Sequence, residues 1–284
     1  MIVVQYFVEF IFYSFLGWVW ESVYCTINEK KWADRGFLFG PICPIYGSCV
    51  IVVSILFSLI PALADPNFPL WGIFIISTIG SAIAEFGTSW VLEKRFNARW
   101  WDYSHMPLNI QGRICLPVSL CFGLAGVAVV KLLLPFVAGL HETIPDIVYV
   151  TLGLILAGIF GADFALTEAS LSSLLKDVEN MHAEFVGKNQ ARYEKVQSGV
   201  EYIETKVNES KAAMTERVNT AKENLSQKHA NRLSFNERRI LESIEKFTPN
   251  KNKTDEHNKT RLMLTEELKK FARKPKDKKE EETV

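Results

Sequence analysis

The chain has 284 residues, with 32 basic and 32 acidic side chains and a formal net charge of zero. This balance excludes a strongly basic nucleic-acid binder, and we expect no nucleic-acid partner. The charges are unevenly divided, because 8 basic and 11 acidic side chains precede Glu168, whereas 24 and 21 occur from that residue onward. No Gly-x-x-x-x-Gly-Lys-Ser/Thr motif occurs in the sequence, which excludes a P-loop ATPase within this chain.

The first region, residues 1–167, contains five long apolar stretches. A spanning helix needs about 20 predominantly apolar residues, because its backbone must satisfy its own hydrogen bonds in lipid. Such stretches are too apolar on every face for a soluble helical core. We therefore predict an all-α, polytopic membrane bundle with five transmembrane helices, at about residues 2–27, 45–63, 70–92, 116–134 and 147–166.

The loops between these stretches predict the orientation, because short loops rich in Lys and Arg stay on the cytoplasmic side. The second loop (61–69) and the fourth loop (135–146) have no Lys or Arg. The N-terminus is therefore expected outside and the C-terminus inside. We expect residues 1–27 to be retained, because they lack the basic start and short apolar core of a signal peptide. The first and third loops carry seven basic residues, which are Lys30, Lys31, Arg35, Lys94, Arg95, Arg99 and Arg113.

The five cysteines form no Cys-x-x-Cys pair, so neither a disulfide framework nor a zinc site is expected. Four of them belong to an internal repeat. The pattern Gly-x-Ile-Cys occurs at 40–43 and again at 112–115, each time with another cysteine six positions after the first. A glycine also precedes an acidic residue in the first stretch (Glu21) and in the third (Glu85). A parallel duplication of two helical hairpins explains this pattern, and chance similarity of short motifs remains the alternative.

Four acidic residues lie inside the predicted spans, and three of them, Glu21, Glu85 and Asp163, fall in the cytoplasmic third. Intramembrane acids are costly, usually face a bundle interior and by default mark a functional site. The alternatives are that they pair with Arg35, Arg113 or Lys94 to lock helices together, or that they extend into the interface. Glu9, near the outer surface, is expected to be a solvated end residue. Together with polar residues of the two inner loops, the acids form our predicted substrate or coupling site, which comprises Glu21, Arg35, Glu85, Asp102, Asn109, Arg113 and Asp163.

Three segments carry a family resemblance, and they read FLGWVWE at 15–21, RGFLFGPICPIYG at 35–47, and WWDYS with NIQGRICL at 100–104 and 109–116. They resemble the bacterial family of putative ABC-transporter permeases called CmpB-type, or type IV. The resemblance covers about residues 5–165 and implies a multi-spanning protein of the bacterial cell membrane. It brings no assigned substrate and no catalytic residues.

The sequence of the second region, residues 168–284, predicts a helical tail on the cytoplasmic side. From Leu171 to Leu225, apolar or small residues recur in steps of three and four, which indicates a long helix, either a coiled coil or an amphipathic helix lying on the inner leaflet. Ser234 and Glu237 match a capping box that starts another helix, extending to about Phe247. We assign residues 168–247 to this part, and 248–284 to a short helix (261–274) and a disordered, charged end.

The sequence therefore predicts a permease or permease-like subunit, in contact with the lipid bilayer and with any ATPase supplied by another chain. One alternative is a membrane-anchored scaffold or sensor whose tail recruits a cytosolic partner or a second copy of the chain. A third is a membrane enzyme acting on a lipid-linked substrate. We expect no enzyme activity, no metal and no cofactor, because Cys43, Cys115 and His105 have no recognisable catalytic partners in the sequence.

Overall fold

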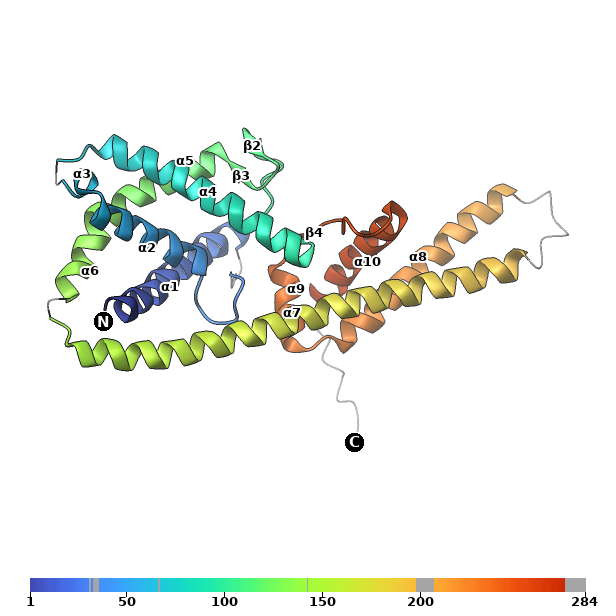
Figure 1. Cartoon of the computed structure of the whole chain (residues 1–284). Coiled ribbons are helices and arrows are strands. Elements are labelled where there is room, and N and C mark those ends of the chain that lie inside the picture. Colours follow the sequence, from blue (N-terminus) through green and yellow to red (C-terminus); the bar gives the residue numbers. More distant parts are fainter. Residues whose placement is uncertain (31, 33–35, 66, 142, 198–206, 274–284) are drawn as a thin grey trace. The chain divides into compact units, whose positions relative to one another are not determined.

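The computed structural model describes residues 1–30, 32, 36–65, 67–141, 143–197 and 207–273, which are mostly helical (Figure 1). The chain divides into two compact units, Met1–Thr167 and Glu168–Val284. The helices are α1 (Ile2–Glu29), α2 (Pro44–Leu59), α3 (Pro61–Ala64), α4 (Leu70–Phe96), α5 (Leu116–Ala128), η1 (Val129–Leu133), α6 (Leu134–His141), α7 (Asp146–Gln197), α8 (Val207–Arg232), α9 (Phe235–Ser243) and α10 (Asp255–Arg273). The strands are β1 (Ala98–Arg99), β2 (Asn109–Ile110), β3 (Ile114–Cys115) and β4 (Lys246–Phe247).

Four helical segments in the described part of the chain are long and apolar enough to cross a membrane, namely Ile2–Ile27, Leu70–Phe96, Leu116–His141 and Asp146–Lys188. The predicted second span is shorter than expected. Helix α2 has 16 residues and ends before Ile60, whose backbone is extended, and Pro61 then starts α3. At a rise of 1.5 Å per residue, α2 is about 24 Å long, somewhat less than the hydrocarbon core of about 30 Å.

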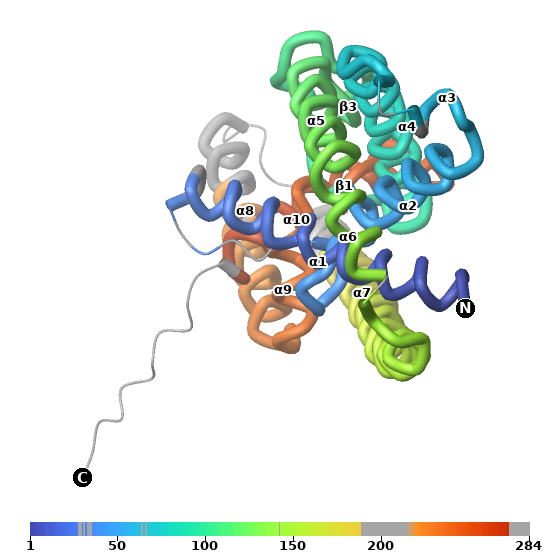
Figure 2. The backbone as a smooth tube through the Cα atoms, turned by 90° about the vertical axis from the view of Figure 1, so that its left-hand side faces the viewer, coloured from blue at the N-terminus to red at the C-terminus, as the bar shows by residue number. Residues whose placement is uncertain are grey.

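The first unit contains two closely packed helical hairpins, α1 with α2 and α4 with α5. Figures 1 and 2 both show α4 and α5 side by side. Glycines allow this close approach, because a Cβ at Gly47 would lie 2.2 Å from Ser14 Oγ, and a Cβ at Gly123 would lie 2.1 Å from Thr78 Oγ1. Small residues are the usual means by which membrane helices come together. Each hairpin therefore has the same kind of packing between its two helices.

The run from α5 through η1 to α6 forms one continuous candidate span, Leu116–His141, with a π-helical turn in its middle. Such turns hold one extra residue within an otherwise α-helical segment. At the end of this run, the fourth loop leads into α7, which begins at Asp146.

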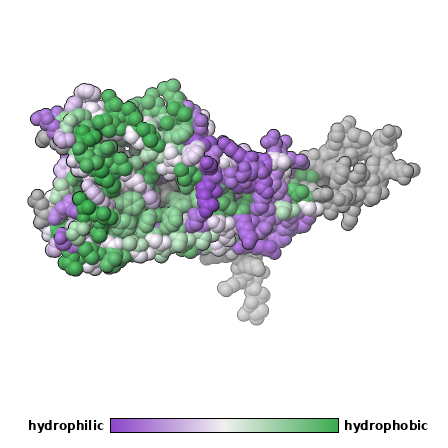
Figure 3. Space-filling view, viewed as in Figure 1, coloured by the Kyte–Doolittle hydropathy of each residue, from purple (hydrophilic) through white to green (hydrophobic). Residues whose placement is uncertain are grey.

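The second unit has its own apolar core, built from helices α7, α8, α9 and α10. On the face shown in Figure 3, hydrophobic side chains cover the first unit, whereas the described surface of the second unit is mostly hydrophilic. Ion pairs join α7 to α8, because Glu184 contacts Lys228 at 2.7 Å and His229 at 3.2 Å. The fully buried core side chains of this unit are Leu171, Leu174, Val178, Met181, Leu241, Ile244, Leu264 and Leu268.

The predicted helices of the tail differ in their boundaries from those observed. The described part of the predicted long helix from Leu171 is helical, with α7 extending to Gln197 and α8 starting at Val207, and residues 198–206 lie outside the described residues. The capping box is confirmed, since Ser234 Oγ accepts from the Glu237 N–H and Glu237 accepts from the Ser234 N–H. Helix α10 begins at Asp255, earlier than predicted, and packs against α8. The coiled coil stays a prediction, and the predicted disordered end at 274–284 lies outside the described residues.

Candidate functional site

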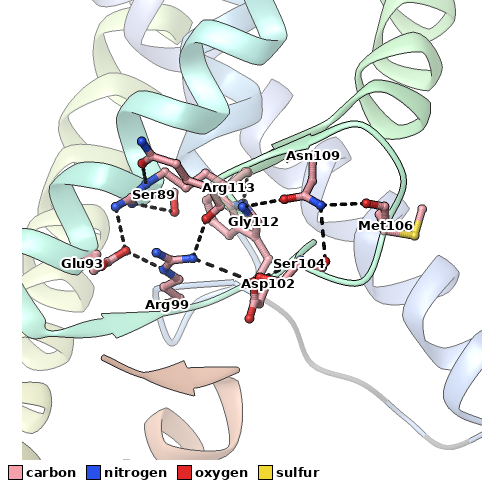
Figure 4. Close-up of polar contacts among 11 residues, drawn as sticks. Ser89, Glu93, Arg99, Asp102, Ser104, Met106, Asn109, Gly112 and Arg113 are labelled. Carbon is pink, nitrogen blue, oxygen red and sulfur yellow. Dashed lines mark hydrogen bonds and ion pairs between the residues drawn. The ribbon is translucent and has the colours of Figure 1, made fainter. Parts of the chain in front are cut away.

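The loop that joins α4 to α5 is built around one carboxylate that binds two arginines (Figure 4). Helix α4 ends at Phe96, and the next residue, Asn97, adopts the left-handed conformation and turns the chain back toward the helix. Glu93 Oε2, on the last turn of α4, lies 2.5 Å from Arg99 Nε and 2.8 Å from Arg113 Nη2. All three side chains are largely buried. A buried charge of this kind is tolerated only when it is paired and hydrogen-bonded.

Arg113 is the most enclosed member of this network and is 6% exposed. Its Nη1 donates to Ser89 Oγ at 3.4 Å, its Nε donates to Gln111 Oε1 at 3.3 Å, and its guanidinium lies over the ring of Phe86. The Trp101 indole N–H donates to the Arg113 carbonyl at 2.9 Å. Side chain and backbone of Arg113 are therefore both fixed against α4 and its loop.

A second set of contacts shapes the turn between β2 and β3 (Figure 4). Asp102 Oδ1 accepts from the Ser104 hydroxyl at 2.5 Å and lies 3.8 Å from Arg99 Nη1. Asn109 donates to the Met106 carbonyl at 2.8 Å and accepts from the Gly112 N–H at 3.1 Å. Arg99, Asp102 and Asn109 thus serve the geometry of the loop itself.

A different cluster surrounds the two intramembrane glutamates. The Tyr103 hydroxyl donates to Glu85 Oε1 at 3.3 Å, Tyr46 is hydrogen-bonded to Glu21, and the Cys43 thiol donates to Glu21 Oε2 at 3.6 Å. Glu21 and Glu85 lie within range of mutual electrostatic repulsion, and Tyr103 interacts with both. These contacts bring α1, α2, α4 and the α4–α5 loop together around two carboxylates.

Glu85 differs from the other acids of the first unit. It is 6% exposed, and its Oε2 has no hydrogen-bond partner in the part of the chain that the structure describes. Burial, together with the neighbouring Glu85, raises the pKa of Tyr103 far above its usual range, so its hydroxyl remains a proton donor. The Tyr103 N–H also donates to the Gly112 carbonyl at 2.8 Å, and the loop network therefore positions the tyrosine on Glu85.

The structure distributes the predicted site residues over three places. Arg113, Asp102 and Asn109 belong to the α4–α5 loop, Glu21 and Glu85 form the tyrosine-linked cluster, and Arg35 lies outside the described residues. Asp163 holds the loop before α2, because its two carboxylate oxygens accept the backbone N–H groups of Phe39 at 2.9 Å and Gly40 at 2.8 Å. Arg113, one of the loop residues considered as a partner for the intramembrane acids, instead binds Glu93 among the described residues.

Four contributors to these clusters were missed in the sequence, namely Tyr46, Glu93, Arg99 and Tyr103. Glu93 and Arg99 were missed because they lie in a basic stretch that is explained equally well as a signal for membrane orientation. The two tyrosines were missed because they lie among aromatic residues typical of the membrane interface. The presence of Tyr46 and Tyr103 in the motifs at 35–47 and 100–104 was the available signal for a role in the site.

The prediction that Glu9 is solvated is wrong. Glu9 is 7% exposed, and its carboxylate lies 3.0 Å from His141 Nε2 and accepts from the Tyr13 hydroxyl at 3.3 Å. His141 Nδ1 in turn contacts Tyr149 Oη at 2.8 Å and Gln5 Nε2 at 2.5 Å. This polar cluster joins α1, the end of α6 and the start of α7.

Among the described residues, no group of three or more His, Cys, Asp or Glu side chains could hold a metal ion. The long apolar helices and the buried polar clusters between them define a helical membrane protein. A family model described as Putative ABC-transporter type IV matches residues 8–168, more than half of the chain, and the chain therefore belongs to that family. This confirms the resemblance drawn from the sequence motifs. No curated protein and no solved structure matches the chain.

Proposed function

We propose that this protein is a permease-like subunit of a bacterial transport system, with the Glu21–Glu85 cluster as its substrate or coupling site. The role is binding and translocation rather than catalysis, with the ATPase supplied by another chain. The observation that carries the proposal is the buried Oε2 of Glu85, which has no hydrogen-bond partner among the described residues and lies beside a second carboxylate in the interior of the bundle.

The contrast with the loop network supports this assignment. Acids that serve only to hold a structure together are paired, as Glu93 is with Arg99 and Arg113. Glu85 receives one hydrogen bond from a neutral tyrosine, although placing an acid in the bundle is costly. An oxygen in this state can accept a proton, a cation or a hydrogen-bond donor on a substrate. A site that binds a passing ligand requires this capacity.

The proposal includes five spans, with α2 as a short fifth span, the N-terminus outside and the tail inside. An odd number of spans places the two ends of the bundle on opposite sides of the membrane. The basic residues of the first and third loops support this orientation in the bacterial cell membrane.

The test compares Glu85→Gln with the control Glu93→Gln in the full-length protein. In the described part of the chain Glu85 forms no ion pair, so we expect Glu85→Gln to change the melting temperature in detergent by only a few degrees while transport activity is lost. Glu93→Gln leaves two buried guanidinium groups without their carboxylate, which costs about 3 to 5 kcal/mol and should lower the melting temperature strongly.

Activity requires the partner, so the first step is purification from native membranes and measurement of ATP hydrolysis by the isolated complex. We expect a P-loop ATPase to co-purify and Glu85→Gln to uncouple it. If no ATPase is present, or if Glu85→Gln lowers stability as much as Glu93→Gln and activity follows the protein level, the proposed transport site is wrong.

A scaffold or sensor role is the second candidate. It is favoured by the separate core of the second unit, which a simple membrane anchor would not require. A cytosolic protein, or a second copy of the chain, that co-purifies only when the second unit is present would support this candidate.

A further inference from the structure

The β2–β3 hairpin presents aliphatic side chains on one side. The strands are antiparallel, with Asn109 opposite Cys115 and Ile110 opposite Ile114. Next to the paired strands, the Leu116 N–H donates to the Leu108 carbonyl at 3.3 Å. Directly opposite residues have side chains on the same side of an antiparallel pair. The hairpin therefore places Ile110 and Ile114 on one side, and it brings Leu108 next to Leu116.

Leu108 and Ile110 of this hairpin are exposed, and little of the rest of the described chain covers them. Leu108 is 73% exposed and Ile110 is 55% exposed, whereas Cys115, from the intervening position, is 1% exposed. Leu116 is the first residue of α5, and the exposed Leu120 and Leu124 follow it at intervals of four residues. Residues four apart lie on one face of a helix. The exposed face of the hairpin thus continues into an apolar stripe along a candidate membrane-spanning segment.

The hairpin carries no charge that would keep it in water. Residues 104–112 contain no Lys, Arg, Asp or Glu, and Arg113 is buried against Glu93 and Ser89. The backbone is also held in a demanding shape, because Leu108 and Gln111 adopt positive φ values of 50° and 54°. Such conformations persist only where the surrounding contacts enforce them. A well-fixed turn therefore presents Leu108 outward.

We propose that the β2–β3 hairpin inserts into the bilayer interface and that lipid covers Leu108 and Ile110. Three observations select lipid as the occupant: the continuity with the apolar stripe of α5, the uncharged tip and the inward direction of Arg113. The insertion is shallow, roughly the 5 to 10 Å typical of interfacial elements. The hairpin anchors the loop network at the membrane surface, independently of whether the Glu21–Glu85 cluster transports a ligand.

The test uses photo-cross-linking in the full chain, in its own membranes. A diazirine-bearing amino acid is placed at Leu108, and separately at Ile110 so that a poorly folded variant at one position does not decide the result. Leu124 in α5 is the lipid-facing control, and the exposed Lys251 of the second unit is the control for a hydrophilic surface. After illumination, mass spectrometry identifies the adducts.

We expect lipid adducts at Leu108 and Ile110 with at least half the yield found at Leu124, and none at Lys251. Adducts with another protein at the two hairpin positions would overturn the proposal in favour of a protein partner. The proposal would also be overturned if Leu124 formed lipid adducts while Leu108 and Ile110 formed none.

Discussion

Glu93 shows how much of a loop can depend on a single side chain. It receives Arg99 from the start of the loop and Arg113 from its end, so that one carboxylate closes a segment of more than a dozen residues. The Arg99 side chain adds a bond from Nη1 to the Gln111 carbonyl at 2.9 Å. Loss of Glu93 would therefore release both ends of the loop together.

Gly112 offers a sharper test of the same loop. Its φ of +68° is strained for any residue with a Cβ, and a Cβ built there would lie 2.4 Å from both Asp102 Oδ1 and Ser104 Oγ. We expect Gly112→Ala to lower stability by about 1 to 3 kcal/mol. The measurement is the melting temperature of the full chain in detergent.

The matched control is Gly87→Ala in α4, where an added Cβ meets nothing within 4 Å. Alanine is the better helix former, so this variant should be at least as stable as the parent chain. An equal loss of stability in the two variants would show that the contacts of Gly112 are not responsible.

At the scale of elements, the length and apolar composition of the helices could be predicted from sequence, because a single long apolar run is a local property. The four helical segments Ile2–Ile27, Leu70–Phe96, Leu116–His141 and Asp146–Lys188 each contain one predicted span. The end of α2 was misplaced because the apolar run continues past Leu59, although Pro61 starts a new turn.

The candidate site was less accessible to prediction, since it depends on which side chains meet across elements. The acids Glu21 and Glu85 were found because an isolated charge in an apolar run stands out. Their partners Tyr46 and Tyr103 were not found, because a tyrosine near a span has several equally good explanations. The direction of Arg113 toward Glu93 depends on how the chain turns back at Asn97. This turn follows from the left-handed conformation of Asn97.

The contact between α8 and α10 predicts a pH dependence in the second unit. Hydrogen bonds from Lys270 at 2.9 Å and Lys222 at 3.2 Å lower the pKa of Glu267. A lowered folded-state pKa gives stability that is complete above the unfolded-state value, about 4.3, and is lost as pH falls through the folded-state value. We expect amide-exchange protection of α8 and α10, corrected for intrinsic rates, to fall in this acidic range.

Glu267→Gln should remove this part of the pH dependence, because the side chain no longer titrates. The neighbouring exposed residue provides the control, as Glu266→Gln should leave it in place. A profile unchanged by Glu267→Gln would assign the acid sensitivity to other carboxylates.

At the scale of the whole molecule, the topology can be measured directly. In a background without the native cysteines, we expect Asn67→Cys to react with an impermeant thiol reagent in intact cells. Lys94→Cys and Lys251→Cys should react only after permeabilisation, because the basic loops favour the cytoplasmic side. All three positions are open at the surface of the chain. Labelling of Lys94→Cys in intact cells would reverse the proposed orientation.

The π-helical turn at Val129–Leu133 has a consequence for insertions and deletions in this chain. Each residue of an α-helix advances the rotation by about 100°, but the wider π turn accommodates its extra residue, so the segment that follows keeps nearly the angular phase of a regular α-helix one residue shorter. His141, at the end of α6, meets Glu9, Gln5 and Tyr149 in that phase. Removal of one residue from the turn would restore a regular α-helix with His141 still facing these partners, whereas removal of a residue elsewhere in Leu116–His141 would rotate His141 away from them by about 100°.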